Sequence, residues 1–173
     1  SRPGNWLLHV SPADRIPLDD LAEMFPKAGR FEAADFELSP ADAEDIGRAL
    51  GAPLVREDRL GTIFFPVDAK AAPPVRTGAA IFTATSLPDG VLVAAVAVDR
   101  SGTIVRAWGG LYAPTGRDSL KELARQLSGR PHDTPLLLGQ TVKPLKGRAK
   151  LSEQGVLAFR KALLILGRRL AAK

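Results

Sequence analysis

Three runs of β-branched and apolar residues in the middle of the chain constrain its fold most. They occupy residues 62–67, 77–86 and 91–98, and such runs are typical of strands. The sequence Leu-Pro-Asp-Gly at residues 87–90 is a tight-turn signal, so we expect the second and third runs to pair antiparallel. A further turn at residues 99–102, where we interpret Asp99 as a turn residue, leads into residues 103–108. The sequence therefore predicts an antiparallel meander of about four strands.

Helical patterns precede these strands. Residues 17–25 favour a short helix with acidic residues in its first turn, and residues 31–38 alternate loosely, as a strand would. The clearest helix of the first half covers residues 39–51. Ser39 is a suitable N-cap, Pro40 suits the first helical position and Gly51 is placed to end the helix.

The last third of the chain is also predicted to be helical. Residues 117–128 predict a helix that ends at Gly129, and residues 130–148 predict a loop. The apolar face of this helix would consist of Leu120, Leu123, Ala124 and Leu127. A long final helix should begin near Ser152. Its apolar stripe, with spacings of three and four, consists of Val156, Phe159, Leu163, Leu166 and Leu170.

These segments together predict a single α+β domain over residues 1–173. An antiparallel sheet of about four strands would pack with helices, including the long C-terminal helix. We expect Val156, Phe159 and Leu163 to face the sheet. The cations of the final helix lie mostly off its apolar stripe: Arg160, Lys161, Arg168 and Arg169.

The formal net charge of +5 conceals an asymmetry along the chain. Residues 1–58 carry 6 basic and 12 acidic side chains, a balance of −6, and the remaining 18 basic and 7 acidic side chains give +11. From Lys143 onward, nine basic residues face a single acid, Glu153. Such a block could meet nucleic acid, an anionic lipid surface or a phosphate-bearing ligand. It could equally be a solvated surface that balances the acidic half.

The residue inventory argues against several kinds of chemistry. The chain contains no cysteine, which removes disulfides, thiolate catalysis and cysteine zinc sites. Its two histidines, His9 and His132, have no metal-ligand spacing, and no Gly-x-Ser-x-Gly sequence accompanies them. We therefore expect no metal site, and an electron carrier or an accessory or interaction domain rather than an enzyme. The longest strongly apolar stretches, residues 91–98 and 162–166, are far shorter than a membrane-spanning helix of about 20 residues, so no transmembrane segment is predicted.

Several short segments occur in an order that matches a known family. Residues 24–31 read Met-Phe-Pro-Lys-Ala-Gly-Arg-Phe, residues 39–53 end in Leu-Gly-Ala-Pro, and residues 96–104 form a strand, an Asp-containing turn and a strand. Residues 120–129 and 134–140 continue the pattern. Over residues 21–166 the chain resembles the FMN-binding domain of the flavin-carrying subunits of the Rnf and sodium-pumping quinone reductase complexes. The resemblance implies a bacterial, periplasmic or otherwise extracytoplasmic protein associated with electron transfer, with membrane-associated redox proteins as partners.

The family's flavin attachment sequence is altered in this chain. Flavinylated members have [ST]-Gly-Ala-Thr-x-Ser at the start of the last helix, and the FMN phosphate is esterified to the threonine. This chain has Gly147, Arg148, Ala149, Lys150, Leu151 and Ser152 there. Ala149 and Ser152 agree with the pattern, whereas Lys150 replaces the threonine and cannot form a phosphoester. Covalent FMN is therefore not expected.

The same segment could still bind a ligand without a covalent bond. A helix N-terminus favours phosphate, and Arg148 and Lys150 add positive charge. Non-covalent FMN, another phosphorylated ligand or an acidic partner could bind there. Alternatively, residues 147–152 form a basic loop that Ser152 caps without any ligand. Trp108 and Tyr112 flank a Gly-Gly pair where a flat ring could stack, although a tryptophan at a strand end is more often part of the core.

Two main hypotheses of function follow, with two weaker ones. The chain could be an FMN-binding-domain-like protein beside an electron-transfer system, without covalent flavin. Alternatively, it could be a flavin-free interaction or regulatory module with the same fold. Nucleic-acid binding through the basic final helix has no recognisable motif in its favour. Attachment of that helix to a membrane surface would need more large apolar residues than its buried stripe leaves over.

Overall fold

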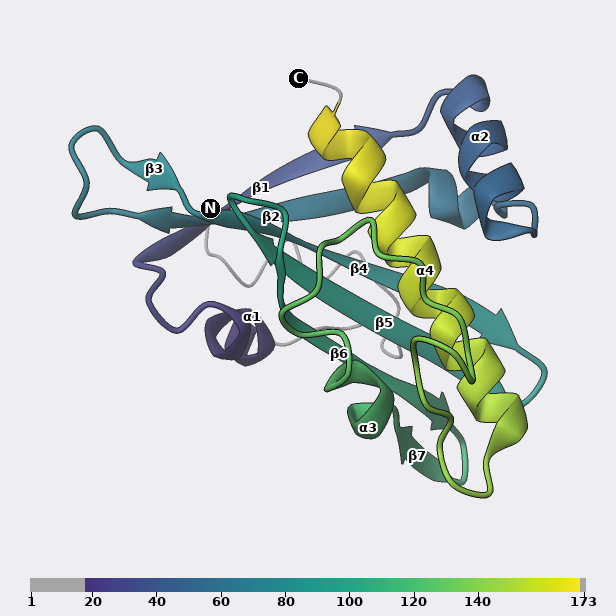
Figure 1. Cartoon of the computed structure of the whole chain (residues 1–173). Helices are drawn as coiled ribbons and strands as arrows, with labels where there is room; N and C mark the ends of the chain where they lie inside the picture. The colour runs from purple at the N-terminus through teal and green to yellow at the C-terminus, as the bar shows by residue number, and fades with distance from the viewer. Residues whose placement is uncertain (1–17, 172–173) are drawn as a thin grey trace.

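Seven strands form one antiparallel sheet in the computed structural model, which describes residues 18–171 (Figure 1). Their order is β1-β2-β4-β5-β6-β7, and β3 pairs with β2 at the side. The strands are β1 Arg30–Glu37, β2 Leu60–Asp68, β3 Val75–Arg76, β4 Gly78–Leu87, β5 Gly90–Asp99, β6 Ile104–Ala113 and β7 Gly116–Ser119. The predicted meander is present as β2, β4, β5 and β6. The predicted number of about four strands was wrong, because β1, β3 and β7 extend the sheet.

Both predicted turns of the meander are confirmed. Leu87 pairs with Gly90 across the β4–β5 hairpin. Between β5 and β6, the carboxylate of Asp99 accepts hydrogen bonds from the backbone N–H groups of Ser101 at 2.9 Å and Thr103 at 3.1 Å. Strand β6 continues five residues beyond the predicted end, to Ala113. This extension gives β7 a strand to pair with.

The helices are α1 Leu18–Met24, α2 Pro40–Leu50, α3 Lys121–Ala124 and α4 Ala149–Ala171, and a 3-10 turn, η2, covers Arg56–Arg59. The caps of α2 are as predicted. Ser39 Oγ accepts a hydrogen bond from the N–H of Asp42 at 3.1 Å, and Gly51 ends the helix with a φ of 78°. Helix α4 begins three residues before Ser152.

The predicted helix over residues 117–128 was wrong over most of its length, because only Lys121–Ala124 is helical. Residues 116–119 instead form β7, in which Ser119 pairs with Gly110 and Asp118 pairs with Leu111 of β6. The four residues of the predicted apolar face are nonetheless all buried: Leu120, Leu123, Ala124 and Leu127. The spacing of these apolar residues therefore predicted which side chains are buried. The conformation of residues 117–119 was decided by their pairing with β6.

Apolar residues cover both faces of the sheet. Helix α4 packs along one face (Figure 1), and its Val156, Phe159 and Leu163 are buried in the main core, as predicted. On the opposite face, Leu21 and Met24 of α1 pack in a smaller cluster with β-strand residues such as Ala95. Within residues 18–171, no helix combines the length and the apolarity that crossing a bilayer requires.

Candidate functional site

The segment predicted to bind a cofactor forms the first turn of α4 and the residues just before it. Gly147 has a φ of +70°, a conformation that favours glycine. The N–H of Arg148 donates to the carbonyl of Leu145 at 3.2 Å, and the N–H of Ser152 donates to the carbonyl of Arg148 at 2.9 Å. The helix therefore continues directly from a tight turn.

The side chain of Arg148 is engaged by the neighbouring strand. Its guanidinium contacts both carboxylate oxygens of Asp118 in β7, with Nη2–Oδ2 at 2.9 Å and Nη1–Oδ1 at 3.4 Å. The hydrogen bonds and charge of Arg148 lower the pKa of the Asp118 carboxyl, and Asp118 raises the pKa of the guanidinium. A fork-to-fork pair of this kind occupies the guanidinium geometry that would otherwise hold a phosphate.

Ser152 points inward, and its hydroxyl both accepts and donates a hydrogen bond within the chain. The side chain is buried, and Oγ accepts from the N–H of Leu145 at 2.8 Å while donating to the carbonyl of Arg148 at 2.7 Å. This hydroxyl fastens the preceding loop to the helix. It is not presented to any ligand outside the protein.

The other predicted site residues give no attachment point. Ala149 and Lys150 are exposed, and the ammonium of Lys150 has no ion pair with the residues that the structure describes. The segment thus offers one free cation and no accessible hydroxyl. These residues do not fit a phosphoester to FMN.

A second group of charged and aromatic side chains was not predicted from the sequence to lie together. A cleft of about 660 Å³ lies between β6 on one side and β7 and α3 on the other. Its lining includes four cations and an indole ring: Arg106, Trp108, Arg117, Lys121 and Arg125. The cleft exists because residues 116–119 pair with β6, which the helix prediction did not allow.

The aromatic residues of this region stack on a cation. The guanidinium of Arg117 lies over the Trp108 ring at 5.0 Å from its centroid and over the Tyr112 ring at 5.1 Å. Stacking of this kind holds a guanidinium in place while leaving its N–H donors at the edge free. The two rings that flank the Gly-Gly pair therefore contact a cation of the same chain, Arg117.

The charges in this cleft are not balanced. Arg106 contacts Glu23 at 3.6 Å and Arg125 contacts Glu122 at 2.9 Å. Arg117 and Lys121, both exposed, have no carboxylate partner anywhere in residues 18–171. Four cations against two carboxylates leave the cleft with an excess of two positive charges.

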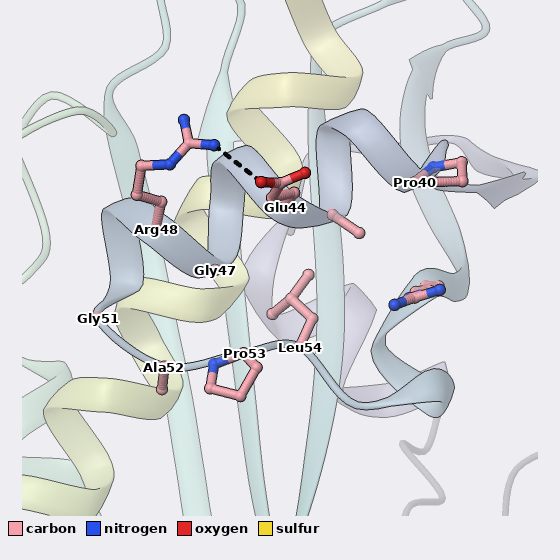
Figure 2. Close-up of a pocket in the computed structure, with 10 residues that line it drawn as sticks. Pro40, Glu44, Gly47, Arg48, Gly51, Ala52, Pro53 and Leu54 are labelled. Carbon is pink, nitrogen blue, oxygen red and sulfur yellow. Dashed lines mark hydrogen bonds and ion pairs between the residues drawn. The ribbon is translucent and has the colours of Figure 1, made fainter.

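A groove of about 670 Å³ runs beside α2 (Figure 2). Small residues form much of it, including Ala43 and Gly47, and Figure 2 shows Leu54 directed toward the helix from the following loop. The cation on the helix, Arg48, is paired with Glu44 at 3.2 Å and with Asp45 at 3.2 Å. The groove is open and presents little unbalanced charge from α2, so we do not assign a function to it.

The position predicted for Lys161 was wrong. It was expected to lie off the buried stripe of the final helix, but its side chain is only 7% exposed. Its ammonium donates to Asp58 Oδ1 at 2.9 Å, to Thr85 Oγ1 at 2.6 Å and to the carbonyl of Ala84 at 3.4 Å. The long aliphatic stem lets the charge reach partners on β4 and η2 across the core.

Potential metal ligands do not cluster within the described part of the chain: no group of three or more His, Asp or Glu residues is found there. The Nδ1 atom of His132 lies 2.9 Å from the carbonyl of Gly102. His9 lies outside the described residues. The histidine that can be placed thus has a structural contact.

Comparisons with known proteins give no relative for this chain. No protein-family model, no curated protein and no solved structure matches it.

Proposed function

We propose that this chain is a flavin-free interaction module that docks to a partner protein beside an electron-transfer system outside the cytoplasm. The resemblance to the FMN-binding domain supports the setting. The closed first turn of α4 supports the absence of flavin and is the single observation that carries the proposal. In this turn Arg148 is held by Asp118, and the Ser152 hydroxyl is buried and fully bonded.

The internal use of the basic residues supports an interaction module over a nucleic-acid or membrane-surface binder. Arg168 contacts Asp42 at 3.5 Å and Asp45 at 3.1 Å, Lys161 contacts Asp58, and Arg160 donates to the carbonyl of Ala49 at 2.9 Å. These contacts join α4 to the acidic first part of the chain. Because these cations are paired within the chain, α4 presents less positive charge to the phosphates of a nucleic acid or a lipid.

A titration of FMN fluorescence with the purified chain tests the proposal. Because no accessible hydroxyl or unpaired arginine receives the phosphate at the start of α4, we expect the FMN emission to stay unchanged as the chain is added. Stoichiometric, saturable quenching would contradict the flavin-free proposal. A double variant, Arg148→Gly with Lys150→Thr, serves as the comparison, because it restores the glycine and the threonine of the family's motif and releases Asp118 from its partner.

A further inference from the structure

The outer edge of β6 is covered at its two ends only. β7 pairs with residues 110–113 of β6. At the other end, the N–H of Ile104 donates to the carbonyl of Arg130 at 2.8 Å, and its carbonyl accepts from the N–H of Gly129 at 2.7 Å. Between these ends, residues 105–108 have no strand beside them on that side within the described residues. The pairing of β5 with β6 skips Val105, so the regular part of this open edge is residues 106–108. An open strand edge is a template for another extended chain.

The same four residues form one wall of the cationic cleft. Val105, Arg106, Ala107 and Trp108 all line it, opposite Lys121 and Arg125 of the α3 region. Figure 1 shows α3 and β7 beside β6 at this edge of the sheet. At about 3.3 Å per residue, the open edge is roughly 10 Å long. A short extended segment would therefore lie between the edge of β6 and the cations.

The exposure of the cleft indicates what kind of occupant it suits. Sites for small organic ligands usually bury 70–90% of the ligand's surface. Here the cations are at the surface, and the side chains of Arg106 and Arg125 are 50% and 61% exposed. Such a lining suits a segment that stays at the surface of a partner protein. The excess of two positive charges selects acidic side chains on that segment.

Resting on the proposed function, we propose that an extended acidic segment of a partner protein docks beside residues 105–108 of β6, with its carboxylates on Arg117 and Lys121. Main-chain hydrogen bonds to the strand edge would supply affinity, and the two cations would supply specificity. The stacking of Arg117 on Trp108 and Tyr112 holds its guanidinium ready, which limits the entropy lost on binding.

The proposal is tested by fluorescence anisotropy with a short labelled peptide of alternating glutamate and valine. We expect saturable binding to the whole chain. Arg117→Glu and Lys121→Glu should each weaken it by at least about tenfold, because each leaves a like charge facing the peptide. Lys150→Glu is the matched control: it makes the same charge change at an exposed residue outside the cleft, and its affinity should stay within about twofold of the unaltered chain. Circular dichroism confirms that each variant is folded.

Two further probes separate strand addition from simple charge attraction. The same peptide with alternate backbone N–H groups methylated should bind weakly, because it cannot pair with the edge of β6. Equal binding of the methylated peptide would overturn strand addition. Tighter binding of a single-stranded oligonucleotide than of the peptide, lost in Arg117→Glu, would overturn the acidic-segment proposal in favour of nucleic acid.

The outcome is distinguishable from failure of the proposed function. If FMN fluorescence is unchanged but the peptide does not bind, the docking site is wrong and the flavin-free module stands. If FMN is bound stoichiometrically, the proposed function is wrong whatever the peptide does.

Discussion

The burial of Lys161 illustrates what residue-scale sequence reasoning misses. Its position relative to the apolar stripe predicted exposure, and only the fold brings Asp58 and Thr85 within reach of its ammonium. Asp58 lies in η2, 103 residues away along the chain. A pattern within one helix contains no information about such a partner. An isolated charge in the core would be costly, whereas this one uses its donors on three oxygens.

We predict that Asp58→Ala lowers the free energy of unfolding by about 3 kcal/mol, because it leaves Lys161 buried without its counter-charge. The double variant Asp58→Leu with Lys161→Met should recover most of that loss. Urea denaturation measures both. The matched control is Glu122→Ala, which breaks the exposed pair with Arg125 and should cost under about 1 kcal/mol. Equal losses for Asp58→Ala and Glu122→Ala would show that the buried pair has no special role.

The carboxylate of Asp99 predicts a pH dependence at the same scale. A hydrogen bond from the Ser101 hydroxyl at 2.6 Å, with backbone N–H donors, lowers its pKa below the ordinary 3.8. The stabilisation is therefore present above pH 3.8 and is lost as the pH falls through the lower pKa of the folded state. Urea unfolding at a series of pH values should show the difference between the unaltered chain and Asp99→Asn shrinking in that acid range. A difference that is constant with pH would contradict this assignment.

At the scale of elements, local signals predicted α2 and the β4–β5 hairpin correctly, since their caps and turns are encoded within a few residues. Residues 117–119 were wrongly predicted to be helical because their conformation depends on β6, which lies before them and provides the pairing partner. The candidate site shows the same division. Residues 147–152 could be located from the sequence, but Asp118, which engages Arg148, could not be found without the strand that carries it. The cleft likewise needs β7 to place Arg117 over Trp108.

We predict that the caps of α2 each contribute measurably to stability. Ser39→Ala removes the acceptor for the N–H of Asp42 and should lower the free energy of unfolding by about 1 kcal/mol, while Ser39→Asp should retain most of it. Gly51→Ala should cost about 1 kcal/mol, because the φ of 78° is unfavourable for alanine. Thermal and urea unfolding check both, and equal stability of Ser39→Ala and Ser39→Asp would exclude side-chain capping.

The start of α4 gives a further prediction. Ser152→Ala leaves the N–H of Leu145 without its acceptor, so the free energy of unfolding should fall by about 1–3 kcal/mol. Lys150→Ala, two residues earlier and exposed, should change it by no more than about 0.5 kcal/mol. Urea denaturation of the two variants checks this. If Ser152→Ala is as stable as Lys150→Ala, the hydroxyl does not fasten the loop to the helix.

At the scale of the whole molecule, the basic and acidic parts of the chain contact each other in the fold. The basic C-terminal helix packs against the acidic α2 (Figure 1), where Arg168 contacts Asp42 and Asp45. The excess positive charge is left elsewhere, and part of it gathers in the cleft beside β6. The docking proposal rests on the first turn of α4, where Asp118 holds Arg148, and on the open edge of β6.

The most direct test of this account is the visible absorption spectrum of the protein purified from its own cells, before and after denaturation and filtration. The account predicts a colourless protein whose filtrate contains no flavin, because the first turn of α4 is closed by Asp118, Arg148 and Ser152. Flavin bands that remain with the denatured chain would show a covalent cofactor and contradict the account. Flavin released into the filtrate would contradict it as well, by showing a non-covalent electron carrier.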